Sequence, residues 1–378
     1  MSKNIWIGVL VVVIVVIAVW IGFSKPKQAS GEPITIGVST ILTGDFAAAG
    51  ENMVNAAKLA VEDVNKNGGI NGRPLTLEVQ DAGCDSKGGL NAAQKLIQAD
   101  GIKYIIGGTC SNGTLAAAPL ANAQHAVYLT PVTGGKNVDE AGDYIFRIAN
   151  SDILAGRDLA NAMLKMGYKK VATITAVTEY TLDIQKTFEQ TIKDQGGTIV
   201  ASEEFQPGTK DYRTTIAKIR SKQPQALLVL SQLGTDAAQF IKQAREASYT
   251  PPIFTDFTLA TNGSVKEILG SLDGIYFADP KYDLNNPTTK TFFERYKTTY
   301  NTDSVVPFHA ASTYDGIMML TNALRAVGDD STKVQQWLSS NVKDFKGLMG
   351  TYSLDAQGNS DLGFTVRVIK DGKPTDIQ

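Results

Sequence analysis

Segment 104–114 combines features that can hold a small anion: an apolar run, the adjacent glycines Gly107 and Gly108, and a serine. Residues 104–106 have the composition of a buried parallel strand, and Gly107 and Gly108 allow the chain to leave it tightly. Ser111 is placed to open a helix expected over 111–123. A strand end, a turn of small residues and a helix N-terminus together attract anions. The segment is therefore a candidate ligand cradle, although Ser111 could instead serve only as a helix cap.

The chain has two cysteines, Cys84 and Cys110, which follow the strands expected at 75–80 and 104–108. If these strands are neighbours in a parallel sheet, the two sulfur atoms come within bonding distance. A disulfide would brace the cradle and would require an oxidising compartment, which places most of the chain outside the cytoplasmic membrane. The alternative is a pair of reduced cysteines buried in the core.

The sequence lacks the motifs of an enzyme. His125 and His309 lie far apart in the chain, and neither has an obvious partner. There is no phosphate-binding loop, metal-ligand cluster or nucleophile elbow, and the Ser-to-Lys spacing at 340–343 falls in a polar helix end. We therefore expect no catalytic residues, no metal and no cofactor. The formal net charge of −2 indicates no basic face for nucleic acid, so the expected partner is a small molecule.

The elements that must position the cradle alternate between strand and helix from Ile34 onward. Two successive series of such units predict an α/β protein with two doubly wound parallel-sheet (Rossmann-like) lobes. Three helical stretches near the C-terminus, 289–300, 308–326 and 332–341, are expected to return to the first sheet. Residues 351–354 and 363–369 are predicted to form a β-hairpin that joins the second lobe.

The N-terminal residues 5–23 carry no charge and are rich in Val and Ile. As a helix they would span roughly 28 Å, which favours an uncleaved transmembrane helix over a cleaved signal peptide. The predicted organisation is an anchor or signal at 1–24, a linker at 25–33, a first lobe of 34–150 plus 281–349, and a second lobe of 151–280 plus 350–378. Several crossing strands, expected to be three, would act as a hinge between the lobes.

A series of segments carries a family resemblance through their order and spacing: 36–44, 67–72, 81–85, 105–111, 129–131, 144–147, 313–315 and 354–358. Together they make residues 34–373 resemble the extracytoplasmic solute-binding proteins of the branched-chain amino acid (Leu/Ile/Val) ABC transporter family. The resemblance implies a type I periplasmic-binding-protein fold, with an interlobe cleft that closes by a hinge. Members of this family commonly carry a disulfide at the positions that match Cys84 and Cys110.

The resemblance also implies ligand contacts from the first lobe. In the family, the carboxylate of an amino acid meets backbone N–H groups and a serine at the position of Ser111. Gly134 stands where the family usually has a threonine, and Thr133 lies one position earlier. The remaining first-lobe candidates flank these residues: Thr109, Asn112 and Val132.

From the second lobe, Tyr180 matches a tyrosine that closes over the ligand. The acidic partner of the ligand ammonium aligns with Phe257, so the neighbouring Asp256 is the candidate for that role, although it could instead cap the next helix. Phe46, in the loop after the first strand, and His309 are further candidates around the ligand side chain.

The function implied is that of the solute-binding subunit of an ABC importer, which captures a small carboxylate-bearing solute, with an amino acid of the branched-chain type favoured. Its expected partners are the ligand and the ABC permease subunits, and the subunit itself is expected to be monomeric. It would lie on the extracytoplasmic face of the cell membrane, anchored by the N-terminal segment or secreted through it. The alternative is a ligand-sensing ectodomain that serves a membrane signalling partner.

Overall fold

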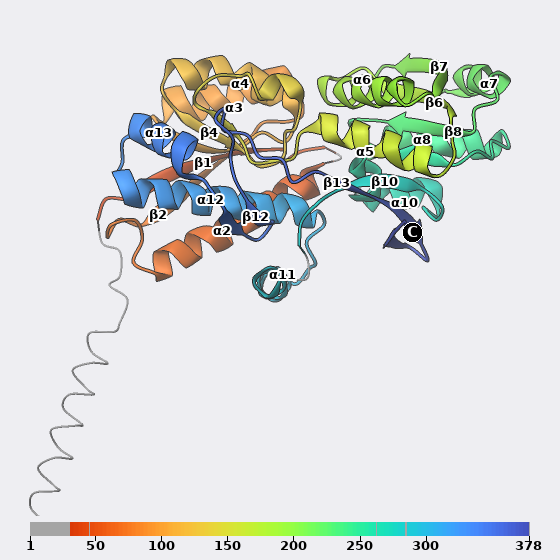
Figure 1. Cartoon of the computed structure of the whole chain (residues 1–378). Helices are drawn as coiled ribbons and strands as arrows, with labels where there is room; N and C mark the ends of the chain where they lie inside the picture. The colour runs from red at the N-terminus through yellow and green to blue at the C-terminus, as the bar shows by residue number, and fades with distance from the viewer. Residues whose placement is uncertain (1–30, 45, 262, 284–285, 378) are drawn as a thin grey trace, which may run out of the picture.

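The computed structural model describes residues 31–44, 46–261, 263–283 and 286–377. The anchor or signal predicted at 1–24 lies outside the described residues, as does most of the linker. Within the described ranges, no helix combines the length and the apolar character needed to cross a membrane. The described residues form two α/β lobes that lie side by side (Figure 1).

The first lobe contains a five-stranded parallel sheet in the order β2-β1-β3-β4-β5. Its strands are β1 (Ile34–Thr40), β2 (Leu75–Asp81), β3 (Tyr104–Gly107), β4 (Val127–Thr130) and β5 (Ile145–Arg147). The inner strands β3 and β4 are buried on both sides because both faces are covered, and alternate residues enter opposite cores. In β3, Tyr104 and Ile106 join one core while Ile105 joins the other.

Helices from distant parts of the chain cover the two faces of this sheet. One face packs on helices from both ends of the sequence: α2 (Ala47–Lys66), α11 (Pro287–Tyr300), α12 (Pro307–Val327) and α13 (Ser331–Asn341). The other face packs on α3 (Ser86–Ala93), the π-helix η1 (Gln94–Ala99) and α4 (Ser111–Ala123). The predicted return to the first sheet is confirmed for α12 and α13, whereas α11 joins the same core by packing on α2 (Figure 1).

The second lobe contains a seven-stranded sheet in the order β14-β13-β10-β9-β8-β6-β7. Its strands are β6 (Lys170–Ala176), β7 (Thr198–Phe205), β8 (Ala226–Leu230), β9 (Ile253–Thr255), β10 (Tyr276–Pro280), β13 (Phe364–Lys370) and β14 (Lys373–Asp376). All neighbouring strands are parallel except for the pairs that involve β13. One face is covered by α5 (Asp152–Lys165) and α6 (Glu179–Asp194), and the other by α7 (Arg213–Ser221), α8 (Gly234–Glu246) and α10 (Gly263–Leu269).

The chain passes between the lobes three times, after β5, after β10 and before β13. Two of these crossings are hydrogen-bonded to each other. The buried Arg147 guanidinium donates to the carbonyl of Ser360 at 2.5 Å, and the Asn150 amide donates to the carbonyl of Gly363 at 2.8 Å. Arg147 also pairs with Asp139 at 2.5 Å. These two crossings therefore form one tied unit between the lobes.

The predicted hairpin between 351–354 and 363–369 is wrong. Instead, β12 (Gly350–Tyr352) pairs with β11 (Phe345–Gly347), while β13 pairs with β10 and β14. Tyr352 packs in the first core, and its hydroxyl donates to the buried Asp315 carboxylate at 3.1 Å. Because this contact holds β12 in the first lobe, the residues after it serve as a crossing rather than as a turn.

Candidate ligand-binding site

A cavity lies between the lobes, where the carboxyl ends of strands from both sheets face each other. This edge is where parallel α/β sheets usually bind ligands. The cavity has about 430 Å³ of empty space, a volume that includes its open mouth. Its lining is Phe46, Cys84, Thr109, Cys110, Ser111, Val132, Thr133, Gly134 and His309 from the first lobe, with Tyr180, Gln232, Phe257 and Thr258 from the second. The structure thus brings together most of the residues predicted from the sequence.

The cradle at Ser111 forms as the sequence predicts, because its glycines admit backbone where a side chain would collide. A Cβ on Gly107 would lie 2.4 Å from the carbonyl oxygen of Ser39. Gly108 has φ of 83°, and a Cβ there would lie 2.1 Å from the Thr114 hydroxyl. The chain then turns into α4 with Ser111 at its first position. Ser111 is 3% exposed and lines the cavity.

The N-cap position of α4 belongs to Cys110 rather than to Ser111. No described side chain caps this helix, so the structure does not support the interpretation of Ser111 as a cap alone. The first turn of α4 faces the cavity with its partial positive charge, which favours an anion there.

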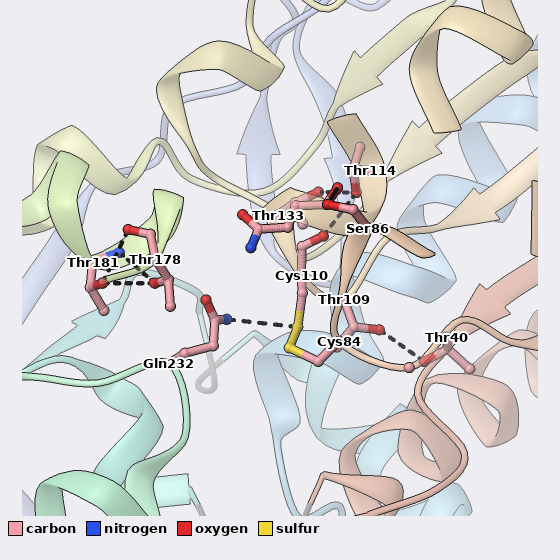
Figure 2. The surroundings of a disulfide bond; sticks show 12 residues. Thr40, Cys84, Ser86, Thr109, Cys110, Thr114, Thr133, Thr178, Thr181 and Gln232 are labelled. Atoms are coloured by element: carbon pink, nitrogen blue, oxygen red, sulfur yellow. Dashed lines mark hydrogen bonds between the residues drawn. A yellow bond between two sulfur atoms is a disulfide. The ribbon is translucent and has the colours of Figure 1, made fainter. Parts of the chain in front are cut away.

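Cys84 and Cys110 form a disulfide with their Cα atoms 5.3 Å apart, which confirms the predicted bridge. The geometric reason differs from the prediction, because β2 and β3 are not neighbours. They flank β1, and the turns that follow them meet across its end. Figure 2 shows the Gln232 amide reaching from the second lobe toward this disulfide, and its nitrogen lies 3.7 Å from the Cys110 sulfur. The bridge is thus part of the cavity wall as well as a brace.

Thr133 lines the cavity, and its hydroxyl bonds with two other first-lobe hydroxyls, those of Thr130 and Thr114, at 3.2 Å from Thr114. A side chain at Gly134 is excluded, because a Cβ there would lie 2.2 Å from the carbonyl oxygen of Asn150 and 2.4 Å from the Asp152 carboxylate. The carboxylate of Asp152 therefore occupies the space in which a threonine side chain would stand.

Asp152 is a residue that the sequence analysis missed. It is 3% exposed, and its Oδ2 has no hydrogen-bond partner among the described residues. Burial raises the pKa of Asp152 well above its usual range; the Arg147 charge opposes this shift, and the Asp183 charge adds to it. The only sequence signal was the polar run that follows β5, which reads as an ordinary helix start.

Asp256 lies behind the cavity wall rather than in its lining. Its Oδ1 accepts hydrogen bonds from the backbone N–H of Thr258 at 2.8 Å and from the Thr258 hydroxyl, while its Oδ2 has no partner among the described residues. Burial raises the pKa of Asp256 to about 6, although the bonds from Thr258 lower it. Burial, and then the charges of Asp256 and Asp152, raise the pKa of the Tyr180 phenol well above its usual value. Tyr180 therefore lies near both carboxyl groups.

Four of the predicted residues bring aromatic rings to the cavity lining. The ring of Tyr180 meets that of Phe257 edge to face, with centroids 6.4 Å apart, and Phe257 meets His309 in the same way at 5.9 Å. Phe46 adds a further apolar surface from the loop before α2. Such edge contacts are favourable because the positive rim of one ring faces the negative face of the other.

The predicted and the observed cavity linings differ at several residues. Asn112 lies outside the lining, and its carbonyl accepts a hydrogen bond from the Ser86 hydroxyl at 3.4 Å. Gln232 and Thr258 line the cavity but were not predicted. Their signal was a polar residue just after a buried strand, since Gln232 follows β8 and Thr258 follows β9. That signal is shared by many turn residues, so it selects too many candidates.

The lobes also touch beside the cavity. The backbone N–H of Lys136 donates to the Asp183 carboxylate at 2.7 Å, and the Asn137 amide donates to the Glu179 carboxylate. These bonds join the 3-10 turn η2 (Lys136–Val138) of the first lobe to the start of α6 in the second. The structure is thus one in which the lobes are closed on each other at this edge.

Comparisons with known proteins agree with this architecture. The family described as periplasmic binding protein matches residues 33–373. The Leu/Ile/Val-binding protein of Citrobacter freundii is 25% identical over 342 residues, covering 90% of this chain and 91% of that protein. The substrate binding protein of the branched-chain amino acid transporter of Streptococcus pneumoniae, solved with isoleucine, matches with a TM-score of 0.82 and 25% identity, covering 91% of this chain and 98% of that one.

A more distant structure shows the same fold. The solute binding protein of an R. palustris ABC transporter, solved with benzoate, matches with a TM-score of 0.79 and 22% identity, covering 92% of this chain and 96% of that one. The relatives named here are binding proteins rather than enzymes. Because the family match extends over most of the sequence, this protein belongs to the periplasmic binding protein family.

Proposed function

We propose that this protein is the solute-binding subunit of an ABC importer and that it captures a small carboxylate-bearing solute, with an amino acid favoured. The observation that carries the proposal is the cavity at the first turn of α4, enclosed by residues of both lobes. The ligand carboxylate would lie at Ser111 and the uncapped helix start. Charge-assisted bonds at such a site contribute roughly 1.5–3 kcal/mol each.

An amino group is the second feature that we propose for the ligand. Asp152 and Asp256 are both buried near Tyr180, and each has a carboxyl oxygen without a partner among the described residues. Neither carboxyl group lines the cavity, but a ligand ammonium near them would favour their ionised forms, because an opposite charge lowers the pKa of a carboxyl group. The relatives that bind leucine, isoleucine and valine support an amino acid, and the benzoate-bound structure keeps aromatic acids as the second class to test.

The proposed location is the extracytoplasmic face of the membrane. A stable disulfide requires an oxidising compartment, and the uncharged segment 5–23 would anchor the chain or direct its export. The closed lobes would then be the form presented to the permease.

A thermal-shift screen of the full-length protein tests the proposal. Amino acids, their deaminated analogues and benzoates would be added in parallel, since a ligand that binds only the folded state raises the melting temperature. We expect amino acids to raise it and the analogues to raise it less. If only benzoates raise the melting temperature, the proposed ligand would be an aromatic acid rather than an amino acid. If no carboxylate raises it, the proposed function would be refuted.

A further inference from the structure

His309 is a polar group in the cavity that neither carboxylate nor ammonium recognition uses. Its imidazole is 2% exposed and lines the cavity. Neither Nδ1 nor Nε2 has a hydrogen-bond partner among the described residues. A buried polar group left unpaired is costly, so the native site is expected to supply a partner.

The position of His309 in the fold separates it from the cradle. It lies in the first turn of α12, on the face of the first sheet that packs against α2, whereas Ser111 opens α4 on the other face. The two residues therefore reach the cavity from opposite sides of the sheet edge. The surroundings of His309 are aromatic, with Phe257 and Phe308 each 5.9 Å away between ring centroids.

The imidazole is neutral at physiological pH. Burial lowers the pKa of His309 to about 3, and the first turn of a helix also disfavours a positive charge. A neutral imidazole has one nitrogen that donates and one that accepts. Its complement is a neutral group that can donate and accept, such as a hydroxyl or a carboxamide.

We propose that the ligand carries a hydroxyl or carboxamide group at the end opposite its carboxylate, and that this group is hydrogen-bonded to His309. The inference rests on the proposed function, because it concerns the far end of the same cavity. The aromatic rings would cover the apolar body of the ligand between its two polar ends. An aliphatic side chain such as that of leucine would leave the imidazole unpaired, so this site would select against it.

Matched ligand pairs test the proposal by titration calorimetry on the full-length protein. Each pair differs at the far end only: L-tyrosine with L-phenylalanine, L-glutamine with L-methionine, and 4-hydroxybenzoate with benzoate. In at least one pair we expect the hydroxyl or carboxamide member to bind about tenfold or more tightly, because sites built for a hydrogen bond reject analogues that lack it.

Two variants assign that preference to the imidazole. His309→Leu should reduce the preference to about twofold or less, whereas His309→Gln, which can still donate and accept, should retain part of it. If His309→Leu does not fold, the binding of the ligand pairs to wild type and to His309→Gln still tests the proposal. Equal binding within every pair, or a preference that survives in His309→Leu, would overturn this inference while leaving the proposed function intact. Failure of all six compounds and of leucine to bind would count against both.

Discussion

At Gly134 the chain lacks a side chain because Asp152 occupies the space beside it. A Cβ at this position would collide with the Asn150 carbonyl as well as with the Asp152 carboxylate, so the glycine and the aspartate depend on each other. Where the resembled family usually offers a hydroxyl, this chain offers a buried acidic group near Tyr180. Asp152 does not itself line the cavity, so it would influence a ligand there through its charge, and its protonation state matters.

The hydroxyl of Ser111 is the contact whose removal should most directly weaken ligand binding. In Ser111→Ala we expect about 10- to 100-fold weaker binding, because one charge-assisted bond to the carboxylate is lost. Titration calorimetry with the ligand found in the screen measures the change. Ser86→Ala is the matched control, since Ser86 lies in the same corner and bonds to the Asn112 carbonyl but does not line the cavity. An unchanged affinity in Ser111→Ala would remove this residue from the site.

Asp256 should make the stability of the unliganded protein depend on pH. Its folded pKa of about 6 lies above the ordinary value of 3.8, so between these values the folded state holds a proton that the unfolded chain has released. The free energy of unfolding should therefore fall as pH rises from about 4 to 6, by up to about 3 kcal/mol from this residue.

Urea unfolding of wild type and Asp256→Asn across this pH range isolates the contribution of Asp256. The contribution of Asp315 is present in both proteins and cancels in the difference, whereas Asp152, whose pKa the Asp256 charge raises, adds to it. We expect the difference in stability, wild type minus variant, to decrease with rising pH. A constant or increasing difference would show that Asp256 is ionised without cost in the folded protein.

At the scale of elements, the disulfide joins the turns after β2 and β3 across the end of β1. A bridge that closes a loop of this size contributes on the order of 3 kcal/mol, mainly by restricting the unfolded chain. We expect thiol titration of the unfolded, unreduced protein to find no reactive cysteine, and titration after reduction to find both. Two reactive thiols before reduction would contradict the bridge.

The sequence predicted those elements whose signal is local. The strands, the glycine turn before Ser111 and the late helices all follow from apolar spacing and turn residues. The pairing of β12 with β11 could not be read in this way, because it depends on Asp315, which is distant in the sequence and anchors the Leu348 and Met349 backbone and the Tyr352 hydroxyl. Asp152 was missed for the same reason: its role depends on the space left at Gly134.

At the scale of the whole molecule, the lobes are joined by bonds that do not belong to the cavity lining. In Asp183→Ala the carboxylate that accepts from the Lys136 backbone is lost, so the open form should gain population. We expect a few-fold to about tenfold weaker ligand binding, although Asp183 does not line the cavity.

Small-angle scattering checks the Asp183→Ala variant independently of affinity. The radius of gyration of the unliganded variant should exceed that of wild type, and saturating ligand should bring the two together. Asp194→Ala, at the other end of α6, is the matched control, because its carboxylate bonds only to Gln190 within the helix among the contacts described. Equal radii with weakened binding would assign Asp183 a local role rather than one in closure.

The three crossings have a further consequence for biosynthesis. A chain made from its N-terminus completes β5 long before α12 exists to cover one face of the first sheet, and the second sheet lacks β13 and β14 until the last residues appear. One face of each sheet cannot be fully buried early, because the late residues that complete its core must wait for the rest of the chain. A chain whose folding is delayed in this way would remain incompletely folded during synthesis. This property suits a protein that is to cross a membrane before it takes its shape.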